Sequence, residues 1–180
     1  LNTGLTSDGS ILGTHVMMMI TNTNRYLVNQ MKLESDIEYD NLKIKIGGRM
    51  SHVEFPAGRS EQLIPMVRKE FGDKMVCYAD SNGSYGVEEG IRFGKLLREY
   101  GFAFYEEPVP FDWYEETKAV ADGVDIPLAG GEQEASLHAF RWLIANDALD
   151  IVQPDMYYFG GLIRSMKVAR MAAACGKVCT

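Results

Sequence analysis

The chain has 180 residues, 46% of them hydrophobic, which is enough for one domain with a sizeable core. Its formal net charge is -7 and no basic stripe offsets it, so we expect neither nucleic acid nor an anionic membrane as a partner. The longest early apolar run, Val16–Ile20, is far too short to span a bilayer.

The three cysteines, Cys77, Cys175 and Cys179, form an odd set, and Cys77 and Cys175 lie among apolar neighbours. This pattern is typical of reduced thiols in the core of a cytoplasmic protein rather than of a disulfide framework. We therefore expect a cytoplasmic location and no disulfide bond.

Residues 1–38 differ in character from the rest of the chain, because they are rich in Asn, Thr and Ser. The Val16–Ile20 run has two interpretations: a strand of the fold that follows, or the end of a preceding domain. We predict an N-terminal segment of uncertain type over residues 1–38 and a separate catalytic domain over residues 39–180.

From about residue 40, short apolar strands alternate with segments whose apolar residues recur at helical spacing. The predicted strands are Leu42–Ile46, Met75–Ala79, Phe102–Tyr105, Pro127–Ala129 and Ile151–Gln153, and a sixth begins at Lys177–Cys179. This alternation predicts an α/β fold with parallel strands, of the (β/α)8 TIM-barrel type.

A complete barrel of this type needs about 200 residues or more, so we expect an incomplete barrel. The chain would then be a fragment of a longer protein or an incomplete sequence. Bare parallel strand edges would favour aggregation.

Acidic residues follow these apolar stretches at intervals of roughly 23 to 35 residues, about one strand, one helix and two loops, and two lysines lie within the first stretch. These charged residues are Lys43, Lys45, Asp80, Glu106, Glu132 and Asp155. In a parallel βα array, the carboxyl ends of all strands open on one face, so these side chains should converge there. Because Mg²⁺ prefers oxygen ligands, the pattern predicts a metal site with a base beside it.

The same stretches resemble the mandelate racemase branch of the enolase superfamily over roughly residues 40–180. The motifs, in chain order, are Lys43-Ile44-Lys45, Asp80-Ser81-Asn82, Glu106-Glu107-Pro108, Gly131-Glu132, and Gln153-Pro154-Asp155 with Gly160-Gly161. The resemblance implies the C-terminal barrel domain of that superfamily, from about its second strand to the start of its seventh.

The resemblance also implies roles for individual residues. Lys43 and Lys45 match the catalytic lysine pair, of which the second takes the proton α to a carboxylate. The ligands of Mg²⁺, the implied cofactor, fall on Asp80, Glu106 and Glu132.

Four further positions are expected around the substrate or the acid of the reaction. Asn82 matches a residue near the metal and the substrate. Asp155 matches a catalytic acid that orients a histidine of the seventh strand, which would follow Thr180. We also expect Arg49 to meet a substrate carboxylate or hydroxyl and Glu107 to polarise the site, with solvated loop residues as the alternative.

The chemistry agrees with these roles. A proton α to a carboxylate is very weakly acidic, so its removal needs an enediolate stabilised by Mg²⁺ acting as a Lewis acid. Lys43 and Lys45 are two residues apart on a strand and therefore point the same way. A lysine base must be neutral near pH 7, and a second ammonium close by disfavours its protonated form.

An acid at the position of Asp155 is typical of the mandelate racemase-like branch, most of whose members dehydrate sugar acids. We therefore expect a lyase that acts on a small-molecule carboxylate and forms a homo-oligomer when complete. The alternatives are a racemase or epimerase of a 2-hydroxy acid, and a non-catalytic barrel fragment. We expect the 180 residues made alone to be inactive and to fold poorly.

Overall fold

The structure is a computed structural model, and it describes residues 41–50 and 53–180. The predicted N-terminal segment 1–38, with its apolar run, lies outside the described residues. The domain boundary near residue 39 therefore stays a prediction.

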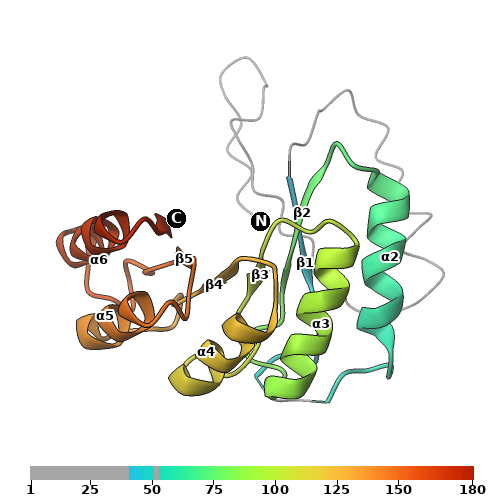
Figure 1. The fold of residues 1–180 in the computed structure, drawn as a ribbon, viewed down its shortest axis with the longest axis horizontal. Helices are drawn as coiled ribbons and strands as arrows, with labels where there is room; N and C mark the ends of the chain where they lie inside the picture. The colour runs from blue at the N-terminus through green and yellow to red at the C-terminus, as the bar shows by residue number, and fades with distance from the viewer. Residues whose placement is uncertain (1–40, 51–52) are drawn as a thin grey trace.

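Six parallel strands form one sheet in chain order (Figure 1). They are β1 (Asn41–Lys45), β2 (Val76–Asp80), β3 (Tyr105–Glu106), β4 (Leu128–Gly130), β5 (Ile151–Val152) and β6 (Val178–Cys179). Each strand pairs in parallel with the next one along the chain. Since every carboxyl end then lies at the same edge of the sheet, the side chains that follow the strands share one rim.

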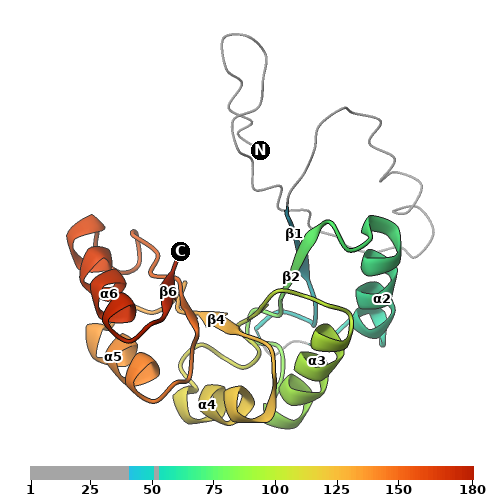
Figure 2. The ribbon, with the colours of Figure 1, turned by 45° about the horizontal axis from the view of Figure 1, so that its top comes forward.

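Five helices connect these strands and cover the outer side of the curved sheet (Figure 2). They are α2 (Arg59–Phe71), α3 (Val87–Glu99), α4 (Tyr114–Gly123), α5 (Leu137–Ala145) and α6 (Leu162–Ala174). This confirms the predicted α/β fold of the TIM-barrel type. In the described residues the sheet is an open arc, with β1 and β6 at its two edges. None of the helices described is long and apolar enough to cross a membrane.

The core lies between the sheet and the helices. In β1, Leu42 and Ile44 are buried, while Lys43 and Lys45 alternate with them and are partly exposed. Successive side chains of a strand point to opposite faces, so the apolar pair faces the helices and the lysine pair faces the inside of the arc. Full burial of one such apolar side chain stabilises the fold by roughly 2 kcal/mol.

Two sequence-based details need correction. Asp80 and Glu106 are the last residues of β2 and β3 and not the first residues after them. The predicted strand Phe102–Tyr105 is longer than β3 and begins earlier, although Ala103 N–H already donates to the carbonyl oxygen of Cys77 at 2.8 Å. The pairing with β2 therefore starts before the regular part of β3.

The expectation of buried thiols holds for Cys77 and is wrong for Cys175. All three cysteines are free, but Cys175 is exposed. The reason is its place at the carboxyl end of α6, where Gly176 turns the chain with a φ of 70°. The residue therefore leaves the helix face that packs on the sheet, and its apolar neighbours in sequence do not cover it.

Candidate active site

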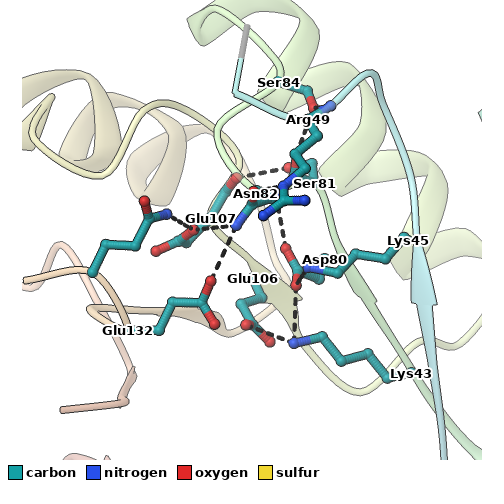
Figure 3. A network of polar contacts seen from close by, with 11 residues as sticks. Lys43, Lys45, Arg49, Asp80, Ser81, Asn82, Ser84, Glu106, Glu107 and Glu132 are labelled. Atoms are coloured by element: carbon teal, nitrogen blue, oxygen red, sulfur yellow. Dashed lines mark hydrogen bonds and ion pairs between the residues drawn. The ribbon is translucent and has the colours of Figure 1, made fainter. Parts of the chain in front are cut away.

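The sheet register brings the lysine pair and two of the predicted metal ligands together. Lys45 lies opposite Asp80 in the pairing of β1 with β2, and Asp80 lies opposite Glu106 in the pairing of β2 with β3. Lys43 Nζ is 2.7 Å from Glu106 Oε1 and 2.9 Å from Asp80 Oδ2, and Lys45 Nζ also pairs with Asp80 Oδ2 (Figure 3). Both lysines therefore point to the same side of β1, as predicted, because both pair with Asp80.

The two carboxylates of this cluster are deeply buried, with Asp80 0% and Glu106 1% exposed. Burial by itself would lower the pKa of Lys43, but Asp80 and Glu106 outweigh it and raise that pKa above its ordinary value. Burial, followed by the neighbouring Asp80, raises the pKa of Glu106. Asp80 and Glu106 are thus buried side by side, and positive charge from Lys43, Lys45 or a bound cation stabilises their ionised forms.

A second group of contacts joins the loops that follow β2, β3 and β4. Asn82 Nδ2 donates to Glu107 Oε2 at 3.2 Å and to Glu132 Oε1 at 3.1 Å, and Gln133 Nε2 donates to Glu107 Oε2 at 3.0 Å (Figure 3). Burial, with the charges of Glu132 and Asp80 next in importance, raises the pKa of Glu107 to about 8. Glu107 thus accepts hydrogen bonds from two side-chain amides, and its predicted role in polarising the site stays a prediction.

Gln133 was missed by the sequence analysis. Its only signal is its position directly after Glu132, in the loop between β4 and α5.

Arg49 is exposed in the loop after β1 and reaches the same network. Its Nε donates to Asn82 Oδ1 at 3.1 Å, and its backbone N–H donates to Ser84 Oγ at 2.7 Å. The close approach of the loop after β1 to the loop after β2 depends on Gly47, where an added Cβ would lie 2.5 Å from the Cβ of Ser84. The loops after β1 and β2 are therefore held together at the rim.

The residue types fit the implied Mg²⁺. Glu106 Oε2 and Glu107 Oε1 are buried and have no hydrogen-bond partner among the described residues. Such carboxylate oxygens are the ligands that Mg²⁺ prefers, and an unpaired buried oxygen is costly unless a cation or donor meets it.

The carboxylates of the three predicted ligands point to ion-pair and hydrogen-bond partners. Asp80 and Glu106 turn to Lys43, and Glu132 turns to Asn82. In residues 41–50 and 53–180, no three His, Cys, Asp or Glu side chains are already arranged as a ligand set. The three predicted ligands share one rim, and their role as ligands stays a prediction.

Asp155 lies apart from this contact network, in the loop between β5 and α6. Its Oδ1 accepts hydrogen bonds from the N–H groups of Tyr157 at 2.7 Å and Tyr158 at 3.1 Å. The carboxylate thus stabilises the turn that leads into α6, and its predicted role in orienting a histidine stays a prediction.

Comparisons with known proteins bear on this arrangement. The chain matches the family model described as enolase C-terminal domain-like over residues 25–180. It is 28% identical over 138 residues to an arabinonate dehydratase of Saccharolobus solfataricus, which covers 77% of this chain and 35% of that protein.

Two solved structures show the same arrangement of elements. One is a mandelate racemase/muconate lactonizing protein from Paracoccus denitrificans PD1222 complexed with magnesium, with 31% identity and a TM-score of 0.70, covering 78% of this chain and 38% of that one. The other is L-talarate dehydratase from Polaromonas sp. JS666 complexed with Mg and L-glucarate, with 26% identity and a TM-score of 0.69, covering 78% and 36%.

The chain thus spans little more than a third of the length of these relatives. The family match extends over most of the chain, the parallel βα arrangement agrees with it, and both confirm the resemblance drawn from the motifs. The chain belongs to the enolase C-terminal domain-like family.

Proposed function

We propose that the full-length protein is a Mg²⁺-dependent dehydratase of a sugar acid, which begins by removing the proton α to the substrate carboxylate. The observation that carries the proposal is the convergence of Lys43 and Lys45 with two buried carboxylates at one rim of the sheet. The dehydratase names of the Saccharolobus and Polaromonas relatives support the choice of reaction.

In this proposal Lys45 is the base, and its Nζ accepts the α-proton. Asp80, Glu106 and Glu132 would hold Mg²⁺, which supplies positive charge for the oxygens of the substrate carboxylate when it is bound. Lys43 remains an ammonium against its two carboxylate partners.

Arg49 and Asn82 would orient the substrate. The Arg49 guanidinium is exposed at the rim and hydrogen-bonded to Asn82 Oδ1, so it can meet an incoming carboxylate or hydroxyl oxygen. A small carboxylate is therefore the class of molecule that fits the site.

Dehydration transfers the α-proton to Lys45 and releases the β-hydroxyl as water. The electron pair of the broken α C–H bond becomes the second bond between the α and β carbons, and the β-hydroxyl leaves as water with a proton from a general acid. In the family pattern, Asp155 would position that acid.

Racemisation or epimerisation of a 2-hydroxy acid is the second candidate. It uses the same first step, but a proton returns to the opposite face of the α carbon and no water is lost. The racemase name of the Paracoccus structure supports it. Product analysis separates the two, because only dehydration yields a 2-keto-3-deoxy acid.

The test uses the full-length protein, a set of sugar acids, Mg²⁺ and deuterated water. We expect Lys45→Ala to slow exchange of the α-proton by about 10²–10⁴-fold while leaving Mg²⁺ affinity nearly unchanged. The matched control is Lys95→Ala, which removes an exposed lysine of α3. Exchange at the wild-type rate in Lys45→Ala would show that Lys45 is not the base.

A further inference from the structure

We propose that Glu134 and Tyr114 form a positioning pair that fixes the loop between β4 and α5, residues 131–136, and with it the carboxylate of Glu132. The inference rests on the proposed function, because it assigns the pair a role in binding Mg²⁺ through Glu132. Neither residue is placed among the predicted ligands or the groups that touch substrate.

The carboxylate of Glu134 is buried, with 5% exposed, and both of its oxygens are used. The Tyr114 hydroxyl donates to Glu134 Oε2 at 2.7 Å, and the Ser136 N–H donates to Glu134 Oε1 at 2.6 Å. Hydrogen bonds weaken steeply away from linear geometry, so two of them restrict the direction of the carboxylate. They therefore hold the direction of this side chain and the course of the loop around it.

Contacts fix both ends of this loop, and Glu132 lies between them. At its start, Gly131 has a φ of 104°, and an added Cβ would lie 2.6 Å from the ring of Phe140. The N–H of Glu134 donates to the carbonyl oxygen of Gly131 at 3.1 Å. At its end, Ser136 caps α5, where its Oγ accepts from the N–H of Ala139 at 3.4 Å.

Tyr114 connects this loop to the helices on both sides. It is the first residue of α4, and its ring lies against Trp142 of α5 with 6.1 Å between the centroids. Glu132 itself has a side-chain contact with Asn82 across the rim. The backbone position of Glu132 is therefore set by the loop, and the loop is tied to α4 through the hydroxyl of Tyr114.

A buried carboxylate is a poor means of stabilising the packing of α4 against α5, because its desolvation is costly. Glu134 instead fixes the course of the loop that carries Glu132. Residues that hold a metal ligand in place typically contribute 10–100-fold to metal affinity, although they never touch the metal.

The experiment measures Mg²⁺ binding to the full-length protein by titration calorimetry, together with turnover. Tyr114→Phe keeps the ring and removes only the donor, and we expect it to raise the Kd for Mg²⁺ about 10-fold. Turnover at saturating Mg²⁺ should stay close to that of the wild type, since the substrate groups are untouched. Glu134→Ala should weaken Mg²⁺ binding at least as much, and Glu134→Gln should weaken it less, because its side-chain oxygen still accepts from Ser136.

Thr117→Val is the matched control. Thr117 is a buried residue of the same helix, and its Oγ1 donates to the carbonyl oxygen of Trp113 at 2.7 Å without reaching the loop. We expect this variant to bind Mg²⁺ as the wild type does.

Two results would overturn the pair's role: wild-type Mg²⁺ affinity in Tyr114→Phe, or an equal loss of affinity in Thr117→Val. If the wild type binds Mg²⁺ and turns over while Tyr114→Phe is unchanged, only the positioning role fails. If the wild type does not bind Mg²⁺, the proposed function fails with it. Should Glu134→Ala not fold, Tyr114→Phe and Glu134→Gln still test the positioning role.

Discussion

At the scale of single residues, Lys43 links two buried carboxylates that would otherwise face each other. Removing one member of a buried ion pair leaves a charge without compensation. We expect Lys43→Met to lower the free energy of unfolding of the metal-free protein by about 3 kcal/mol, at the smaller end of such losses because Lys45 still pairs with Asp80. Urea denaturation in the presence of a chelator measures this, and Lys95→Met on exposed α3 should change stability by no more than about 0.5 kcal/mol.

The same prediction has a pH dependence whose sign follows from the raised pKa of Lys43. A lysine whose pKa is higher in the folded state contributes stability that is fully present below its ordinary value of 10.5 and is lost as the pH rises through the folded pKa. The difference between wild type and Lys43→Met should therefore be constant from about pH 6 to pH 9 and shrink in more alkaline solution. A difference that vanished near neutral pH would contradict the ion-pair interpretation.

At the scale of the elements, the loop after β4 depends on one glycine. Gly131→Ala places a Cβ 2.6 Å from the Phe140 ring in a backbone conformation that side chains rarely adopt. We expect it to cost about 2 kcal/mol of stability and to weaken Mg²⁺ binding, because Glu132 must move with the backbone. In the matched control, Gly86→Ala, the added Cβ meets nothing within 4 Å, so stability should change by no more than about 0.5 kcal/mol. Equal effects of the two substitutions would show that the Phe140 contact is unimportant.

The elements were also the part of the molecule that the sequence predicted best. Apolar runs such as Leu42–Ile46 alternate with helical patterns, and this period is a local property that tertiary packing here reinforces. The end of each strand was less certain, because pairing with a neighbour decides it, as the contact of Ala103 with β2 shows.

The site was predictable where strand periodicity positions a residue and less so where a loop does. The common face of Lys43 and Lys45 follows from their spacing on β1. In contrast, the contacts of Gln133 and of Glu134 depend on the course of a loop between two elements, which leaves no period in the sequence. The burial of Glu107 under Asn82 is of the same kind.

At the scale of the whole molecule, the curved sheet has its helices on the outer side, and α6 lies next to the edge strand β6 (Figure 2). Large apolar side chains are exposed on α6 and on the loop before it. They are Met156, Tyr157, Tyr158, Leu162, Ile163 and Met166. Exposed apolar side chains in one helix and the loop before it, together with a strand edge, favour association between molecules.

We therefore expect the 180-residue chain, made by itself, to associate as its concentration rises and to show no dehydration of sugar acids. Ile163 is 79% exposed on α6, so Ile163→Lys places a charge in the apolar surface without disturbing the core. In sedimentation experiments this variant should shift the average mass towards the 20.1 kDa of one chain. Ala145→Lys adds the same charge at an exposed position of α5 and should leave the association unchanged. Equal suppression by both would attribute the effect to net charge, and association that neither reduces would place the contact at the strand edges, whose backbone groups a side-chain charge on α6 does not cover.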